Sequence, residues 1–313
     1  MNTEAKIVIF LLFLSPILAE LVTGNAPPLV FFNPVYFLFL LLLYGCGVLL
    51  IREVKVRWKL QWSVVFLAVA YGIIEEGLAT KAFFNPMHNG GEVLSGYGMY
   101  FGVQWIWAIS TTLFHTTIST LIPIVMAGLL WPKYKDKPIL NKKWIFVFAG
   151  FIIAVLFGML AFPYYPKPVL LICSFIVVVL LVLFSYKYKN SKISAGKYLF
   201  SPFIFGVFGF IFQLLNLFAS SVLAGLNVSA LITLFIQFLL IILLLLFIKY
   251  QIYSRNITKR HIVALIFGSI IFYIILAPFN ELSGKLGMLL VGIISLILLI
   301  IWSKKVLRKK EGK

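Results

Sequence analysis

The chain has 313 residues, of which 62% are hydrophobic and only 12% are charged. Because a soluble globular domain carries about 25% charged residues, this composition excludes a water-soluble protein and indicates a multi-pass membrane protein. The formal net charge of +18 would suit nucleic acid, but the Lys and Arg residues form short clusters between apolar runs, which excludes a soluble basic domain and nucleic acid as a partner.

Ten apolar runs, separated by proline, glycine and basic residues, predict ten transmembrane helices. They lie near residues 6–24, 34–52, 60–84, 100–131, 144–163, 168–187, 199–224, 227–250, 260–278 and 285–303. The predicted fold class is therefore an all-α bundle of membrane helices. The first four runs hold most of the ionisable residues at membrane depth, so we divide the chain into a four-span unit, 1–131, and an apolar six-span unit, 132–313.

The Lys and Arg residues alternate regularly between the two sides of this ten-span arrangement. If the amino terminus is cytoplasmic, 24 of the 27 lie in cytoplasmic loops or at the chain ends, and Lys81, Lys167 and Lys285 lie on the other side. Because positive residues that flank membrane helices stay on the cytoplasmic side, both termini are predicted to be cytoplasmic. The expected location is a prokaryotic plasma membrane, whose anionic head groups attract such basic clusters.

The first span has two interpretations. Residues 6–19 have the charged start and apolar core of a signal peptide. Pro16 interrupts that core, and Glu20 is an unusual residue directly after a cleavage site at Ala19, so we favour a retained helix. Glu20 lies near the outer end of this helix, where it either reaches the interface or joins the polar cluster of the following spans.

The third span carries two adjacent carboxylates, Glu75 and Glu76. The small residues Ala68, Gly72 and Ala79 recur with them at steps of three or four, which predicts a face that approaches another helix closely. Charged residues are costly to bury in a membrane. We therefore expect these carboxylates to face the interior of the bundle and to mark a functional site.

The fourth span presents a matching polar face. Its members, spaced by three or four residues, are Ala108, Thr111 or Thr112, His115 and Ser119. At about 1.5 Å per residue, His115 lies about 24 Å from the cytoplasmic end of its span and Glu75 about 22 Å from that of the third. The glutamates and the histidine are therefore level on consecutive antiparallel helices. Pro123 predicts a kink in this long span, because it removes the hydrogen bond to the carbonyl of Ser119.

Two carboxylates and one imidazole at the same depth suit three roles. As ligands they would bind a divalent cation such as Zn²⁺, and Glu75, Glu76 and His115 are our candidate catalytic and metal-ligating residues. They also suit a proton relay in a transporter, because buried, closely spaced carboxyl groups exchange protons near neutral pH. The third role is structural, with hydrogen bonds that only hold the third and fourth spans together.

The other ionisable residues near the membrane are expected to be less central. Lys81 is expected to extend to the interface or to act as a counter-ion. His88 and His261 are expected to be solvated, the first in a loop and the second at the start of a helix.

A Glu-Glu pair on one membrane helix, followed about forty residues later by a histidine on the next, resembles the CAAX-protease and bacteriocin-processing family of intramembrane metalloproteases. The resemblance covers about residues 70–120. It implies a membrane-embedded hydrolytic site built from Glu75, Glu76 and His115. The chain is also similar to polytopic prokaryotic membrane proteins of unassigned function.

The sequence departs from that family's motifs at three points. Thr80 stands where the motif Glu-Glu-x-x-x-Arg has arginine, and Thr111 stands where Phe-x-x-x-His has its aromatic residue. The family's later His-x-x-x-Asn motif has no counterpart, because His261 is followed four residues later by Leu265. The resemblance therefore implies one histidine at membrane depth where the family has two.

Overall fold

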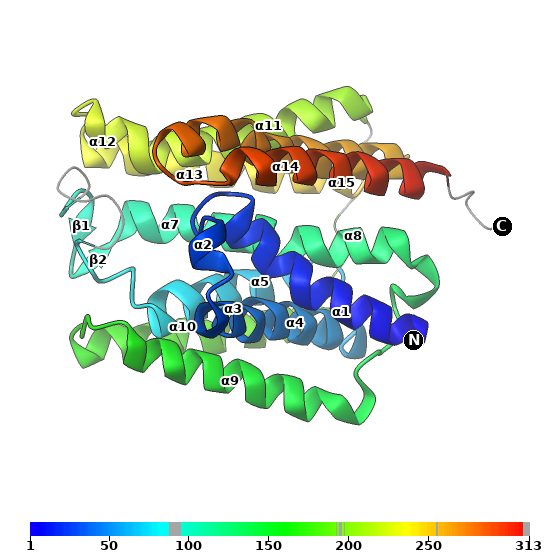
Figure 1. Cartoon of the computed structure of the whole chain (residues 1–313), viewed down its shortest axis with the longest axis horizontal. Coiled ribbons are helices and arrows are strands. Elements are labelled where there is room, and N and C mark those ends of the chain that lie inside the picture. Colours follow the sequence, from blue (N-terminus) through cyan, green and yellow to red (C-terminus); the bar gives the residue numbers. More distant parts are fainter. Residues whose placement is uncertain (88–94, 192, 194–195, 197, 255, 309–313) are drawn as a thin grey trace.

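The computed structural model describes residues 1–87, 95–191, 193, 196, 198–254 and 256–308, and its regular structure is almost entirely helical (Figure 1). The exception within the described residues is one short antiparallel hairpin, formed by β1 (Met99–Tyr100) and β2 (Val103–Gln104). The predicted all-α membrane bundle is therefore confirmed.

Several of the helices are continued without a break by a short π-helical segment. The first part of the chain contains α1 (Thr3–Pro16), η1 (Ile17–Leu21), α2 (Pro28–Phe31), α3 (Pro34–Leu40), η2 (Leu41–Gly45), α4 (Cys46–Arg57), α5 (Val64–Ile73), η3 (Ile74–Ala79), α7 (Trp105–Phe114), η4 (His115–Leu121) and α8 (Ile122–Leu130). The second part contains the 3₁₀ turns η5 (Pro132–Tyr134) and η6 (Asn141–Lys143), then α9 (Trp144–Ala161), α10 (Pro168–Lys187), α11 (Pro202–Leu217), η7 (Phe218–Val222), α12 (Leu223–Gly225), α13 (Ala230–Phe247), η8 (Ile248–Ile252), α14 (Lys259–Leu282) and α15 (Met288–Arg308). Here η1 to η4, η7 and η8 are π-helical.

The helices coincide with the predicted spans. Among the described residues, eight helical stretches are long and apolar enough to cross a membrane. The two remaining predicted spans, 6–24 and 60–84, correspond to the continuous helical stretches 3–21 and 64–79, which carry the candidate glutamates. Every predicted span thus has a helix, although that of the third is shorter than predicted.

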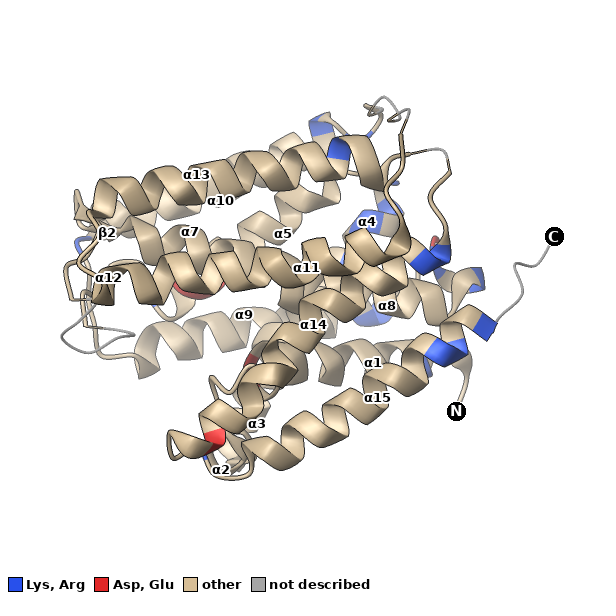
Figure 2. Ribbon diagram, turned by 90° about the horizontal axis from the view of Figure 1, so that it is seen from above, with Lys and Arg blue, Asp and Glu red and all other residues tan. Residues whose placement is uncertain are grey.

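Most of the described Lys and Arg residues lie at the end of the bundle where α1 begins and α15 ends, here named the basic end (Figure 2). The loops 58–63 and 131–143 lie at this end, whereas the loops 22–27 and 283–287 lie at the opposite, far end. This separation is the one that the positive-inside rule requires. The assignment of the basic end to the cytoplasm stays a prediction.

Local sequence explains where several helices begin. Proline occupies the first position of α2, α3, α10 and α11, where its missing N–H costs nothing and its fixed φ suits the helix. The Asn33 side chain caps α3 by accepting hydrogen bonds from the N–H groups of Val35 and Tyr36, at 3.1 and 3.2 Å.

The helices are arranged around a central group. In Figure 1, α11, α13, α14 and α15 form one side of the bundle, α9 forms the opposite edge, and α1, α7 and α8 lie between them. The tight pairing of α11 with α14 depends on glycine, because a Cβ added at Gly268 would lie only 1.9 Å from the carbonyl oxygen of Gly206. Large apolar side chains are exposed along α9, α10, α13 and α15, as expected of faces that contact lipid.

Candidate functional site

The polar residues at membrane depth lie on π-helical segments of four different helices. Glu20 lies on η1, Tyr44 on η2, Glu75 and Glu76 on η3, and His115 at the start of η4. Single π-helical turns inside α-helices occur frequently at functional sites. The four segments meet near the middle of the bundle and direct these side chains towards one another.

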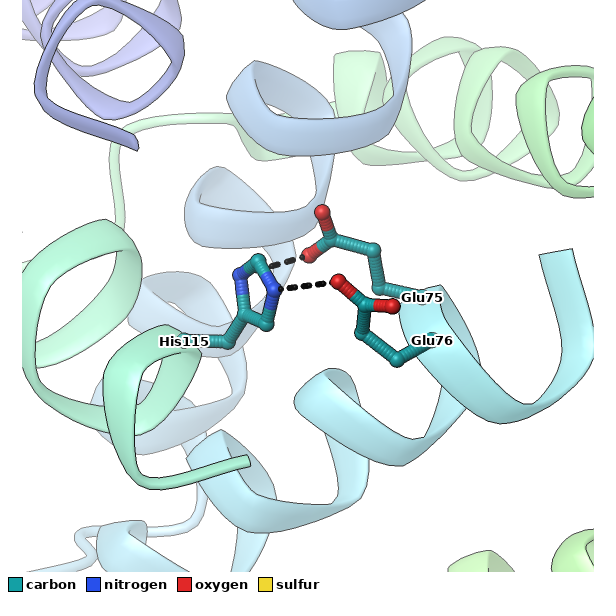
Figure 3. A group of neighbouring side chains, drawn as sticks. All are labelled: Glu75, Glu76 and His115. Atoms are coloured by element: carbon teal, nitrogen blue, oxygen red, sulfur yellow. Dashed lines mark hydrogen bonds and ion pairs between the residues drawn. The ribbon is translucent and has the colours of Figure 1, made fainter. Parts of the chain in front are cut away.

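The structure brings Glu75, Glu76 and His115 together (Figure 3). Oε1 of Glu76 lies 3.1 Å from Nε2 of His115, and Oε2 of Glu75 lies 3.1 Å from Nδ1 of the same ring. Each ring nitrogen therefore faces a different carboxylate. Glu75 and His115 are each 2% exposed and Glu76 is 9% exposed, so the three groups form a buried acid–base cluster.

Nδ1 of His115 also lies 3.3 Å from the hydroxyl of Ser119, which donates to the carbonyl of His115 at 2.9 Å. Although Oε2 of Glu75 is close to Nδ1, it makes no hydrogen bond to any described residue. The imidazole of His115 is therefore the group that compensates for the burial of this oxygen.

Glu20 belongs to the same cluster, which decides between the two positions expected for it. The hydroxyl of Tyr44 donates a hydrogen bond to Oε1 of Glu20, and it also interacts with the carboxyl group of Glu75. Tyr44 thus connects the carboxylate of the first span to those of the third. The sequence analysis did not select Tyr44; a hydroxyl in the middle of the apolar second span was the available signal.

The kink predicted at Pro123 stays a prediction, but the fourth span does change its helix type ahead of this residue. The fourth span changes from α-helix to π-helix at His115 and returns to α-helix just before Pro123. The carbonyl of Ser119, which Pro123 leaves without its helical donor, accepts a hydrogen bond of 2.5 Å from the hydroxyl of Ser15 on α1. This contact holds η4 against the first helix, and thereby positions His115.

The small-residue face of the third span contacts two neighbours. A Cβ added at Gly72 would lie 3.3 Å from the Cβ of His115 and from the Cα of Thr112, so glycine allows this close approach to the fourth span. Ala79, one turn beyond the glutamates, instead packs against Gly158 of α9. The prediction of a single partner helix for this face was therefore too simple.

The cluster lies at the bottom of a cavity of about 750 Å³. The lining residues that lie nearest the basic end form its floor: Glu20, Tyr44, Glu75, His115, Asn216 and Tyr273. Its rim at the far end includes Asn25, which is exposed, and Lys285, whose Nζ donates to the carbonyl of Gly24 at 2.8 Å. All the lining residues belong to the far half of their helices or to the far-end loops, so the cavity reaches the cluster from one side.

Helices that the sequence analysis regarded as apolar also contribute to this cavity. Asn216 of α11, Ser220 of η7 and Tyr273 of α14 line it, opposite the glutamates of the first and third spans. The amide of Asn216 donates to the carbonyl of Ser110 at 3.1 Å, which fixes α11 against α7. An isolated asparagine in an apolar run was the signal for this contribution.

The expectation for Lys81 was wrong. Its side chain is 2% exposed, and Nζ donates to the carbonyls of Met159 and Phe162 at 2.6 and 2.7 Å. A lysine there satisfies carbonyls at the C-terminal end of α9 and interacts favourably with the helix dipole. It therefore anchors α9 beside the segment that carries the glutamates.

The expectation that His261 is solvated was also wrong. It is 8% exposed, and its Nδ1 lies 2.8 Å from the hydroxyl of Thr258 in a capping box at the start of α14. A histidine with this local role is not part of the cavity lining. His88 lies outside the described residues.

The donor set of the cluster fits a divalent cation. One ligand atom from each of Glu75, Glu76 and His115 lies within 4.8 Å of the others, and Oε2 of Glu75 lacks a hydrogen bond. Each carboxylate faces a different ring nitrogen, so His115 and one of the two glutamates could bind the cation together. A histidine that binds metal through one nitrogen usually donates its other N–H to a carboxylate, which the second glutamate provides here.

The comparisons with known proteins identify a family without assigning a role. No curated protein and no solved structure matches the chain. One family model matches residues 9–307, which is nearly the whole chain. The chain therefore belongs to an uncharacterized membrane protein family.

Proposed function

We propose that the protein is an intramembrane metal-dependent hydrolase in which Glu75, Glu76 and His115 activate water at the floor of the cavity. The observation that carries this proposal is the access to the cluster: the lining residues come only from the far half of the bundle, so one side of the membrane reaches it. A site with access from one side suits an enzyme, whereas a transporter would also need a second conformation in which the site opens to the other side.

The residues of the cluster divide into ligands and a base. His115 would hold Zn²⁺ through one ring nitrogen together with a neighbouring carboxylate, and the bound cation would supply a water molecule of lowered pKa. The carboxylate that does not bind the metal would be the candidate base for that water, since the three donor atoms lie within 4.8 Å of one another. Ser119 and Ser15 hold η4 in place, so the imidazole stays directed at the carboxylates.

Burial strengthens the electrostatic interactions of these groups. The cluster lies among apolar helices, where interactions between charges are less screened than in water. The aromatic and apolar side chains that share the cavity lining, such as Phe39, Phe114 and Leu276, would exclude bulk water once a substrate occupies it. The arrangement therefore favours hydrolysis of a substrate that is itself embedded in or attached to the membrane.

Proton-coupled transport is the second candidate, and one observation favours it. Glu20, Tyr44, Glu75, His115 and Glu76 form a continuous series of interacting groups that could exchange protons. Chains of this kind mark proton relays in pumps and transporters. In a transporter, the cavity would also have to open at the basic end in a second conformation.

The metal content of the purified protein tests the proposal. After incubation with Zn²⁺ and removal of free metal, we expect about one zinc ion per wild-type chain and a large loss of zinc in Glu75→Gln, Glu76→Gln and His115→Ala, measured by mass spectrometry of the metal. Glutamine keeps the shape of glutamate but is a poor zinc ligand. Asp136→Asn is the control, because Asp136 is exposed at the basic end.

Thermal unfolding of the same proteins separates the metal site from a purely structural cluster. If the cluster binds zinc, the metal should raise the melting temperature of the wild type and of Asp136→Asn. It should not raise the melting temperature of the Glu75, Glu76 and His115 variants. A wild type without zinc, together with glutamine variants that are more stable because a neutral amide is cheaper to bury, would contradict the proposal.

A further inference from the structure

Tyr71 is a buried tyrosine of the third span that does not line the cavity. It lies on α5, one helical turn before Glu75, and is 3% exposed. Its hydroxyl donates to the carbonyl of Leu43 at 3.3 Å and also interacts with the carboxyl group of Glu75. A hydroxyl from outside the cavity lining therefore reaches the acid–base cluster.

The ring of Tyr71 is confined by three neighbouring segments. Its centroid lies 6.4 Å from that of Tyr44 on η2 and 6.1 Å from that of Phe151 on α9. On α4, a Cβ added at Gly47 would lie only 2.4 Å from Cε2 of Tyr71, so glycine makes room for this ring. Because the ring is confined, its hydroxyl is held at one place beside Glu75.

The carboxyl group of Glu75 is surrounded by buried side chains. The hydroxyls of Tyr44 and Tyr71 both interact with it, and its Oε2 lies 3.1 Å from Nδ1 of His115. Glu75, Tyr44 and His115 are each 2% exposed, whereas Glu76, which faces Nε2 of the same ring, is 9% exposed. Since Glu75 is nearly inaccessible to solvent, neighbouring protein groups rather than bulk water orient its carboxyl group.

We propose that Tyr71 is a positioning residue of the proposed zinc site and acts through Glu75. Its hydroxyl, together with that of Tyr44, holds the carboxyl group so that Oε2 stays beside Nδ1 of His115. Groups of this kind fix the orientation of metal-binding side chains, and their loss typically weakens metal binding by about 10- to 100-fold. The inference rests on the proposed function in so far as the cluster binds zinc. It assigns a role to a side chain that does not line the cavity.

The nitrogen NMR resonances of His115 test this role in the metal-free protein. The chain contains three histidines, so with isotope-labelled histidine the signals of His115 are assigned by their loss in His115→Ala. We expect Tyr71→Phe, which keeps the ring and removes the hydroxyl, to shift the Nδ1 resonance. Gly47→Ala should shift the same resonance, because the added methyl group displaces the ring. Tyr97→Phe is the control and should shift neither, since the Tyr97 hydroxyl lies 2.6 Å from that of Thr233, outside the cavity lining.

A double-mutant cycle shows whether Tyr71 acts through Glu75. In a Glu75→Met background the carboxyl group is absent, so Tyr71→Phe should leave the Nδ1 resonance of His115 nearly unchanged. An Nδ1 shift of equal size in both backgrounds would overturn the proposal. An unchanged resonance in both Tyr71→Phe and Gly47→Ala would overturn it as well.

The affinity for zinc, measured by competition with a chelator of known affinity, gives the second readout. Tyr71→Phe should raise the dissociation constant at least about tenfold, whereas Tyr97→Phe should not change it. Zinc binding by Tyr71→Phe as tight as that of the wild type would overturn the positioning role and leave the proposed function intact. A wild type that binds no zinc would instead overturn the proposed function, and the resonances of His115 would still decide whether Tyr71 positions this ring through Glu75.

Discussion

At the scale of single residues, the site depends on a hydrogen bond that one helix donates to the backbone of another. Ser15 of the first helix supplies the donor that Pro123 removes from the fourth, at the turn that carries Ser119 and follows His115. Without this hydroxyl, a buried carbonyl would face apolar side chains. One serine therefore joins two helices at the level of the acid–base cluster.

The hydrogen bond from Ser15 predicts that substitutions at Ser15 and Pro123 are coupled. Ser15→Ala should destabilise the protein by about 1–2 kcal/mol, because it leaves the carbonyl of Ser119 without a donor. In a Pro123→Ala background the helix can supply its own N–H, so the same substitution should cost less. Unfolding in mixed micelles gives both values, with the exposed Ser283→Ala as the control. Equal costs in the two backgrounds would show that the serine acts in another way.

At the scale of helices and turns, the sequence indicated each span but not the shape of the turns that build the site. Helical spacing and equal depth were enough to place Glu75 and Glu76 opposite His115, because both depend on position along a regular helix. The local sequence of 41–45 and 74–79 does not predict a π-helical turn, because the extra residue in such a turn is stabilised by contacts with neighbouring helices. The π-helical turns are also what bring Tyr44 and Glu20 within reach.

The incorrect expectations share one physical cause. Lys81 and His261 were judged by their position near a membrane boundary, whereas the structure uses each of them at the end of a helix. The role of Asn216 could not be predicted, because its partner, Ser110, lies 106 positions away in the sequence. Contacts between distant segments decide such roles, and a single sequence does not show which helices meet.

At the scale of the whole molecule, the two ends of the bundle differ in charge and in access to the cavity. The basic residues gather at one end, and the cavity reaches the cluster from the other. If the basic end is cytoplasmic, as the positive-inside rule predicts, a substrate of the proposed hydrolase would enter from the outer half of the membrane. The orientation would therefore determine which leaflet supplies that substrate.

Thiol labelling in intact cells tests this orientation. In a background with Cys46 and Cys173 replaced by serine, a cysteine at the exposed position Ser283 should react with an impermeant reagent, whereas one at the exposed position Lys137 should react only after permeabilisation. The reverse pattern would place the basic end outside, and labelling of both positions in intact cells would contradict the arrangement of the helices.

The most direct test of the central claim is the location of bound zinc in an experimental structure of the metal-loaded protein. Anomalous diffraction at the zinc absorption edge should show one strong peak beside His115, within about 2.0–2.2 Å of one ring nitrogen and of at least one oxygen of Glu75 or Glu76. A crystal grown with zinc whose anomalous map shows no peak at this cluster, with His115 still between the two carboxylates, would contradict the claim.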